Sequence, residues 1–279
     1  MNQNQWKIIN YYKSLESRLG YTFLTWDTKH FGYYPSKRRD ISEKKAQILM
    51  MDLVAQKLEL KNKDFVLDAG CGRGTTSLYL AQKYGCKIIG IDIVKFELDI
   101  GERKKNQLNL IDKVNFYLKD YSDTKFPNNY FDKIFTLETL VHSPNIVKTL
   151  KEFYRILKPD GKFVLFEYSI SSLDKFDHWE RKMLNIINEG SAMISLGKMF
   201  HNKFPLFIKQ AGFKIISDED ITEHMIPSAY RFNNFAKIPY IIIKLLNLQK
   251  YFINTTAGVE FYKMLKKKLG IYRVILANK

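Results

Sequence analysis

A chain of 279 residues that is 46% hydrophobic and 14% aromatic can bury a large core, which excludes a disordered protein and favours one domain with appended segments. Its two cysteines are too few for a disulfide framework and its five histidines are scattered, so we expect a reducing compartment and no metal site. The net charge of +16 leaves three origins open, namely a lysine-rich composition, an anionic membrane surface and nucleic acid.

Hydrophobic patterning divides the chain into four segments. Residues 1–60 carry no strand-like run and show helical spacing in their second half, so they predict a helical N-terminal lid. Residues 61–217 alternate strands with helices and predict a ligand-binding core. Residues 218–270 interrupt this alternation and predict a helical cap over a substrate, after which residues 271–279 return to a strand.

The alternating segment predicts an α/β fold. Helices that cross between buried apolar strands indicate a mostly parallel sheet with helices on both of its faces. Seven strands are expected, at residues 65–68, 87–92, 114–118, 132–137, 162–167, 213–217 and 272–277. The expected helices lie at residues 42–60, 75–84, 95–108 and 146–157.

The most informative stretch is FVLDAGCGRG at residues 65–74, a hydrophobic strand that ends in an acid and turns through glycines into a helix. Gly70, Gly72 and Gly74 let the backbone approach a ligand closely, where a side chain would block it. The spacing is neither the dinucleotide fingerprint G-x-G-x-x-G nor a phosphate loop, because no GKS or GKT follows. Together with Asp68 before the turn and an acid at the end of the next strand, it resembles motif I of the class I S-adenosylmethionine methyltransferases.

This resemblance implies a Rossmann-like fold with S-adenosylmethionine as cofactor and S-adenosylhomocysteine as product. Ligands of such sheets lie beyond the carboxyl ends of the strands. Asp92 ends the second strand, where a carboxylate can accept both ribose hydroxyls, and Asp120 can accept from the adenine amine between Ile93 and Tyr121. The expected cofactor-binding residues are Asp68, Gly70, Cys71, Gly72, Asp92, Ile93, Asp120, Tyr121 and Glu138.

Glu138 and His142 follow the fourth strand in LETLVHSPN, at the mouth of the sheet. A base at this place can accept the proton that methyl transfer releases at carbon, nitrogen or oxygen. His142 could instead cap or pack at a helix start. The Asn-Pro-Pro-Tyr signature of amino-methyltransferases is absent and no RNA-binding appendage is recognisable, so we expect no nucleic-acid partner.

Three further segments resemble the sterol 24-C-methyltransferases and, more distantly, the tocopherol methyltransferases. Residues 21–34 resemble the aromatic N-terminal stretch of these enzymes. Residues 137–144 have Glu, His and Pro at the same relative positions as the family's motif after the fourth strand. LKPDGKFVLFEYS, which is followed by Asp-Lys-Phe-Asp at 174–177, resembles the family's fifth strand and the segment after it. The resemblance implies C-methylation of a sterol or isoprenoid side chain, a small hydrophobic substrate whose carbocation aromatic rings stabilise. It implies the catalytic residues Glu138, His142 and His30 and the substrate-binding residues Tyr12, Trp26, Phe31, Tyr33 and Tyr34.

Several alternatives stay open at this point. They are an O- or N-methyltransferase of a small metabolite or quinone with His142 as base, an RNA methyltransferase, and a module that binds the cofactor without catalysis. Residues 237–253 are apolar on one side and lysine-bearing on the other, so they either lie flat on a bilayer or form a lid helix, and their apolar run is too short to span one. The N-terminus lacks a signal-peptide core, which predicts a cytoplasmic protein, with peripheral membrane contact through 237–253 and a homo-oligomer both left open.

Overall fold

The computed structural model describes residues 2–23 and 28–279. Its strands are β1 (Phe65–Ala69), β2 (Lys87–Asp92), β3 (Val114–Leu118), β4 (Phe131–Leu137), β5 (Leu157–Ile170), β6 (Lys214–Asp220) and β7 (Gly270–Asn278). They form one seven-stranded sheet in the order β3-β2-β1-β4-β5-β7-β6, in which only β7 runs antiparallel to its neighbours. The predicted α/β class and mostly parallel sheet are therefore confirmed.

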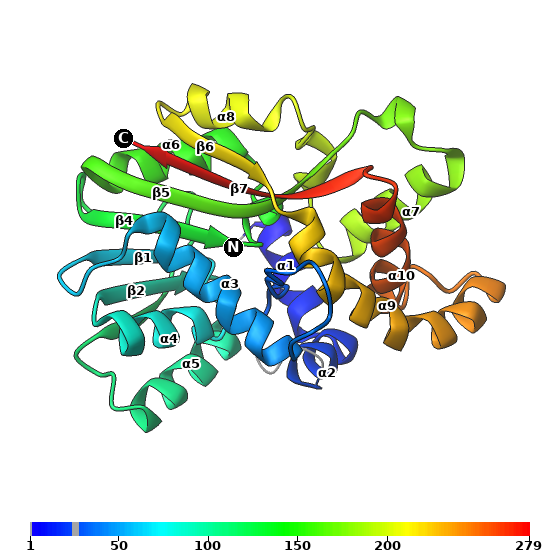
Figure 1. Ribbon diagram of the computed structural model, residues 1–279, viewed down its shortest axis with the longest axis horizontal. Coiled ribbons are helices and arrows are strands. Elements are labelled where there is room, and N and C mark those ends of the chain that lie inside the picture. Colours follow the sequence, from blue (N-terminus) through cyan, green and yellow to red (C-terminus); the bar gives the residue numbers. More distant parts are fainter. Residues whose placement is uncertain (1, 24–27) are drawn as a thin grey trace.

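The helices cover both faces of this sheet. Within the described ranges they are α1 (Gln3–Lys13), α2 (Leu15–Phe23), α3 (Glu43–Leu58), α4 (Thr75–Tyr84), α5 (Lys95–Gln107), α6 (Ile146–Ile156), α7 (His178–Gly190), α8 (Phe204–Gln210), α9 (Thr222–Leu245) and α10 (Ile253–Lys266). Single 3-10 turns lie at Leu140–His142, Leu173–Lys175 and Leu196–Lys198. Figure 1 shows α3 crossing in front of the sheet near α4, while α6 lies behind it and contacts α8.

The central strands form because their apolar residues run almost without interruption. Val66 and Leu67 of β1 and Ile134 of β4 are fully buried, as expected for parallel strands covered by helices on both faces. The register places Leu67 between Ile89 of β2 and Ile134 of β4. The strand order reverses between β1 and β4, so the glycine turn after β1 lies at the switch point where such sheets bind ligands.

Strand β5 begins at Leu157, earlier than the predicted Lys162. Helix α6 ends at Ile156, and the chain enters the sheet at once, with Leu157 already paired to β4. Residues 158–161 form an irregularity inside the strand, because Asp160 takes a φ of 58° and pairing with β4 resumes at Lys162.

The cap between β6 and β7 consists of two helices, and the break between them falls within residues 237–253. Helix α9 ends at Leu245 and α10 begins at Ile253. Asn247 between them has a φ of 53°, the left-handed conformation that commonly ends a helix. None of the helices in the described part of the chain is long and apolar enough to cross a membrane.

The N-terminal helices divide between two places. Figure 1 shows α1 next to the arrowhead of β4, beyond the carboxyl end of that strand. Ile8 and Ile9 of α1 form a small buried cluster with Val94 and Ala192, which anchors this helix there. Helix α3 instead lies on the face of the sheet beside α4, and the Ser42 side chain caps its first turn.

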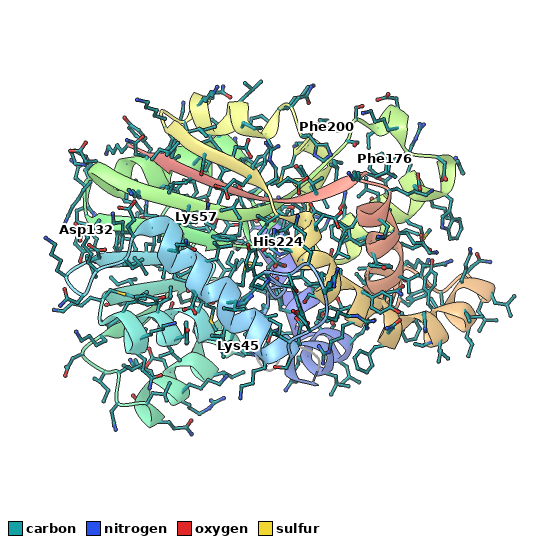
Figure 2. The ribbon with its side chains drawn as sticks, viewed as in Figure 1. Lys45, Lys57, Asp132, Phe176, Phe200 and His224 are labelled. Atoms are coloured by element: carbon teal, nitrogen blue, oxygen red, sulfur yellow. The ribbon has the colours of Figure 1, made fainter. Side chains whose placement is uncertain are left out.

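Residues 33 and 34 are fixed between α3 and α9. His224 at the start of α9 lies near the middle of the molecule in Figure 2, and its ring stacks on Tyr33 with centroids 4.7 Å apart. The main-chain N–H of Tyr34 donates to the carbonyl of His224 over 2.9 Å. The Tyr34 hydroxyl donates to the Glu43 carboxylate of α3 over 3.0 Å. Tyr33 and Tyr34 thus hold this part of the chain in place from both sides.

Candidate active site

The glycine turn after β1 leaves no room for a side chain at Gly70. Gly70 has a φ of 87° and Gly72 a φ of 52°, both in the left-handed region that favours glycine. A Cβ atom on Gly70 would overlap the side chain of Thr139, which follows β4. The amides of Gly70 and Cys71 donate to the carbonyl of Ile91 over 2.8 and 3.0 Å, which fixes the turn against β2.

Two carboxylates flank this turn. Asp68 is buried at the end of β1 and accepts a hydrogen bond from the Ser77 hydroxyl over 2.6 Å, and burial raises its pKa to about 7. Asp92 ends β2 and accepts from the amides of Gly72 and Val94 over 2.8 and 2.9 Å, one on each oxygen. Because each oxygen has a second lone pair, Asp92 can still accept two hydroxyl groups.

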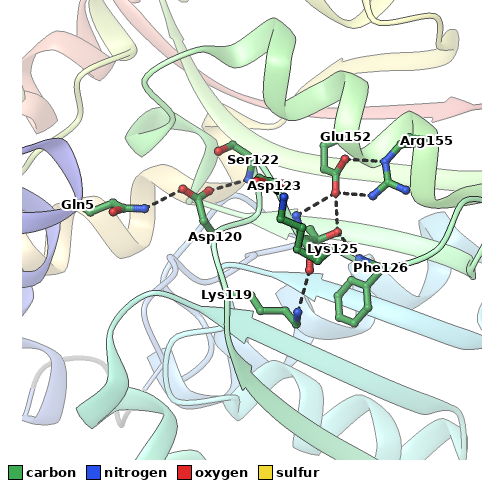
Figure 3. Close-up of polar contacts among 10 residues, drawn as sticks. Gln5, Lys119, Asp120, Ser122, Asp123, Lys125, Phe126, Glu152 and Arg155 are labelled. Carbon is green, nitrogen blue, oxygen red and sulfur yellow. Dashed lines mark hydrogen bonds and ion pairs between the residues drawn. The ribbon is translucent and has the colours of Figure 1, made fainter. Parts of the chain in front are cut away.

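The loop after β3 holds a third carboxylate. Asp120 accepts from the Ser122 amide over 2.7 Å and from the Gln5 side chain of α1 over 2.8 Å, as Figure 3 shows. Glu152 of α6 accepts from the amide of Thr124 over 2.9 Å and so fixes the same loop from the other side. The contact with Gln5 brings the first turn of α1 to the end of the ligand crevice.

Two adjoining cavities open at the carboxyl ends of the strands. The first, which we call the turn cavity, has a volume of about 90 Å³ and contains the glycine turn and the three carboxylates. The second, which we call the aromatic cavity, has a volume of about 290 Å³ and lies mainly among apolar side chains of α7, α9 and α10. Both cavities are lined by Tyr12, Lys29, His30, Glu138 and His142.

Glu138 is the polar centre of this junction. Its oxygens accept hydrogen bonds from the Phe31 amide over 2.8 Å, from the Tyr272 hydroxyl over 2.9 Å and from the Tyr168 hydroxyl. Burial nevertheless raises its pKa to about 7. Its φ of 55° is strained for a residue other than glycine, and such strain gathers at functional sites.

His142 holds Tyr12 of α1 over the junction. Its Nδ1 lies 2.9 Å from the carbonyl of Ala192, which can only accept, so Nδ1 carries the proton. Its Nε2 must then accept from the Tyr12 hydroxyl, 3.1 Å away. Burial lowers the pKa of His142 to about 4, so the imidazole is neutral at pH 7.

His30 lines both cavities, and one of its ring nitrogens has no hydrogen-bond partner among the described residues. Its Nδ1 lies 3.0 Å from the carbonyl of Phe31 and therefore carries the proton. Its Nε2 is buried, and among the described residues it has no hydrogen-bond partner. Burial lowers the pKa of His30 to about 4. A buried polar atom without a partner is uncommon in folded proteins, and here it belongs to a residue that lines both cavities.

Lys29 connects residues 28–30 to α5 through an ion pair. Its Nζ lies 2.9 Å from Glu97 of α5 and 4.1 Å from the centre of the Tyr12 ring. Glu97 is itself buried and also bonds Arg73 of the glycine turn over 2.7 Å. The ion pair therefore links residues 28–30 to the turn through α5.

Comparisons with known proteins agree with this geometry. Residues 67–165 match a family profile described as a methyltransferase domain. The chain is 31% identical over 261 residues to the S-adenosyl-L-methionine-dependent Diels-Alderase iccD of Talaromyces variabilis, an alignment that covers 91% of this chain and 89% of that protein. The chain belongs to the class I S-adenosylmethionine-dependent methyltransferases. Its cofactor is S-adenosylmethionine.

Other relatives of this methyltransferase vary in what they act on. It is 28% identical over 224 residues to a sterol 24-C-methyltransferase of Saccharomyces cerevisiae, which covers 78% of this chain but only 57% of that enzyme. It therefore spans little more than half the length of the sterol enzyme. Its fold matches the cyclopropane synthase MmaA2 of Mycobacterium tuberculosis with a TM-score of 0.82 at 16% identity, over 99% of this chain and 98% of that one. It also matches the geranyl diphosphate C-methyltransferase of Streptomyces coelicolor with a TM-score of 0.77 at 17% identity, over 99% and 98%.

The turn cavity of this methyltransferase fits S-adenosylmethionine. The glycine turn lines this cavity, and glycine at Gly70 lets the turn pack directly against Thr139. Asp92 retains acceptor capacity for two ribose hydroxyls, and Asp120 retains it for an amine. The structure brings all nine residues of the predicted cofactor set to this cavity, namely Asp68, Gly70, Cys71, Gly72, Asp92, Ile93, Asp120, Tyr121 and Glu138.

The predicted substrate-binding residues of this methyltransferase do not all lie at the same place. Tyr12 and Phe31 line the aromatic cavity, and Phe31 meets the rings of Tyr168 and Phe232 edge to face. Tyr33 and Tyr34 lie away from both cavities as the described residues define them, because their rings pack against α9 and α3. Trp26 lies outside the residues that the structure describes.

Sequence reasoning missed several residues at the junction. Tyr168 follows the fifth predicted strand, so its place at the carboxyl edge was a usable signal. Tyr272 stands opposite Tyr168 only because β7 runs antiparallel to β5, a direction that the sequence did not reveal. Phe232 lies on α9 and Phe261 on α10. These helices fall outside the family resemblance, and no sequence pattern there indicated that aromatic residues line a cavity.

Proposed function

We propose that this methyltransferase transfers a methyl group to a carbon atom of a sterol or isoprenoid lipid side chain. The two adjoining cavities support this function, since one fits the cofactor and the other offers an apolar, aromatic wall to an acceptor. The printed names of the relatives, a sterol 24-C-methyltransferase and a geranyl diphosphate C-methyltransferase, agree with an acceptor of this class.

The observation that carries the proposal is the bare Nε2 of His30. It is buried between the cavities and no described residue donates to it. When bound, S-adenosylmethionine would supply an electrophilic methyl group, which the π electrons of an alkene would take up while the S–CH3 bond breaks and its electron pair stays on the sulfur of S-adenosylhomocysteine. The acceptor then carries a positive charge, and His30 Nε2 takes the neighbouring C–H proton, so that the electron pair of that bond restores a double bond.

The aromatic cavity supplies stabilisation for the charged acceptor. The rings of Phe31, Phe232 and Phe261 line it, and those of Phe31 and Tyr168 meet edge to face. A cation over such a ring gains about 0.5–2 kcal/mol, with the larger value in a site without water. Glu138 keeps the rings in place, because it holds the Phe31 backbone and the Tyr168 hydroxyl together.

The low pKa of His30 favours carbon over oxygen as the methylated atom. A base with a pKa of about 4 accepts a proton readily from a carbocation, which is a strong acid. The same base removes a proton poorly from a phenol, whose pKa is about 10. His142 also has a pKa of about 4, and its Nε2 already accepts from Tyr12, so it is no better suited to a phenolic substrate.

The test is incubation with methyl-labelled S-adenosylmethionine and a detergent-dispersed sterol and polyprenol extract. We expect label in the apolar fraction and a product heavier than the acceptor by one CH2 unit. His30→Gln should retain cofactor binding by calorimetry and lose most of the turnover, because its side-chain amide cannot take up the proton. The matched control is His178→Gln, at an exposed histidine on α7, which should leave turnover unchanged. Full turnover in His30→Gln would refute the assignment of the base.

A second candidate is a [4+2] cyclisation in which the cofactor is bound but not consumed. The relative with 31% identity carries the name Diels-Alderase and covers more of this chain than the yeast sterol enzyme does. An apolar cavity with hydrogen-bonding groups at one end, such as Tyr12 and His30, suits such a reaction. A product of unchanged mass, formed from a polyene acceptor without loss of label from the cofactor, would favour this candidate and exclude methylation.

A further inference from the structure

The second half of α9 exposes a row of large apolar side chains. Ile238 is 70% exposed, Ile241 68% and Leu245 79%, where a helix on a protein surface normally presents polar groups. We call the row the α9 ridge, and its members are Phe235, Ile238, Ile241, Ile242, Leu245 and Leu246.

The ridge is not needed to hold α9 in the fold. The opposite side of the helix buries Tyr240 and Ile243 against Val259 of α10. The Tyr240 hydroxyl also donates to buried Glu260 over 2.8 Å. With that side secured, the ridge remains as a contiguous apolar patch, and such patches mark sites of protein or membrane contact.

The positive charge of the residues around the ridge favours contact with a membrane over contact with a protein. From residue 224 to residue 259 the sequence has no Asp or Glu, and it carries Arg231, Lys237, Lys244 and Lys250. The three lysines are exposed, and Lys244 lies 4.7 Å from the ring centre of Trp179. A basic, apolar helix with a tryptophan beside it has the composition of helices that lie in the headgroup region of anionic bilayers.

The ridge also adjoins the aromatic cavity. Phe235 and Pro239 belong to the lining of that cavity, and both are exposed to solvent. The cavity therefore reaches the surface at the base of the ridge. A ligand that leaves the cavity there passes directly along apolar side chains.

We propose that the α9 ridge docks on an anionic membrane surface and lets an acceptor lipid pass from the bilayer into the aromatic cavity. This inference rests on the proposed lipid acceptor. Docking places the isoleucine and leucine side chains among the acyl chains and the lysines at the phosphates. The acceptor then moves from one apolar surrounding to another without crossing water.

The test is co-sedimentation with vesicles of an equimolar mixture of phosphatidylcholine and phosphatidylglycerol. We expect binding that weakens on addition of salt and on replacement by pure phosphatidylcholine vesicles. Ile238→Glu/Ile242→Glu should lower the partition coefficient by about tenfold or more, because it removes two inserted side chains and adds two repelled charges. The control Ile111→Glu/Leu118→Glu changes two similarly exposed apolar residues, one before β3 and one at its end, and should bind like the unaltered enzyme.

Three results would overturn the docking inference. They are failure of the enzyme to sediment with the mixed vesicles, equal binding by the ridge variant with an unchanged unfolding temperature, and a vesicle-free dimer that the ridge variant dissociates. Methylation of a detergent-dispersed acceptor separates this inference from the proposed function. Turnover in detergent without vesicle binding removes only the docking, whereas vesicle binding without any turnover removes only the lipid methylation.

Discussion

The Tyr12 hydroxyl lies 3.1 Å from Nε2 of His142, so the first helix of the chain is bonded to the turn that follows β4, 130 residues away in sequence. The same Tyr12 ring lies beneath the ammonium group of Lys29. Because both side chains line both cavities, this contact closes the site from the N-terminal side.

The Tyr12→Phe variant should be less stable. It leaves Nε2 of His142 buried without a donor, which costs ~1–3 kcal/mol of unfolding free energy. Urea denaturation followed by fluorescence measures this difference. The control Tyr117→Phe removes a hydroxyl from a residue that is 43% exposed on β3, and it should change the stability by less than ~0.5 kcal/mol. Equal unfolding midpoints for both variants would show that the bond contributes nothing.

Glu138 should make the stability of the protein depend on pH. Its pKa of about 7 in the folded state lies above the value of ~4.3 for an exposed glutamate, so between these pH values the folded chain holds the proton more tightly. The burial cost is therefore present in full above pH 7 and is relieved as the pH falls towards 5. The enzyme should gain stability over Glu138→Gln across that interval, by on the order of 3 kcal/mol.

The comparison with Glu138→Gln isolates this group. Asp68 also has a pKa raised by burial, but it is present in both proteins and cancels from the difference, whereas the raised pKa of Glu167 depends in part on the charge of Glu138 and belongs to the same effect. Thermal unfolding at pH 8, 7, 6 and 5 provides the measurement. A difference between the two proteins that stays constant with pH would mean that Glu138 is ionised throughout.

The sequence predicted the parts of the site that depend on one strand and the turn after it. The order of strand, acid and glycines at 65–74 requires a buried strand and a tight turn, and Asp92 follows from the next strand by the same logic. These features are local, so they can be recognised without knowledge of the tertiary structure. All seven strands were placed for the same reason, although the ends of β5, β6 and β7 extend further than predicted.

The sequence could not predict the parts that need distant segments to meet. Tyr33 and Tyr34 look equivalent to Phe31 in an aromatic run, yet hydrogen bonds of the Tyr34 backbone and hydroxyl turn them toward α9 and α3. The pairing of Glu138 with Tyr272 depends on the antiparallel direction of β7. The bare nitrogen of His30 depends on the single carbonyl that fixes its tautomer, which no pattern encodes.

Gly70→Ala should weaken cofactor binding. The new methyl group would overlap the side chain of Thr139, and the φ of 87° is unfavourable for alanine. We expect S-adenosylmethionine affinity at least about tenfold lower, equivalent to ~1.4 kcal/mol, by isothermal calorimetry. Gly197→Ala is the control, since a methyl group there meets only the Asn188 amide at 3.8 Å. Unchanged affinity in Gly70→Ala would place the cofactor away from the turn.

Asp92→Asn should weaken the binding of S-adenosylmethionine without disturbing the aromatic cavity. The carboxylate accepts from the amides of Gly72 and Val94 through separate oxygens, and an asparagine must turn its NH2 group toward one of these donors. The variant therefore loses one acceptor and the charge-assisted part of the others, so we expect affinity about 10- to 100-fold lower by calorimetry, or ~1.4–2.8 kcal/mol. Asp99→Asn, at an exposed acid of α5 paired with Lys95, should bind like the unaltered enzyme. If Asp92→Asn binds S-adenosylmethionine as tightly as Asp99→Asn does, Asp92 accepts nothing from the ribose, and its two backbone bonds are its whole role.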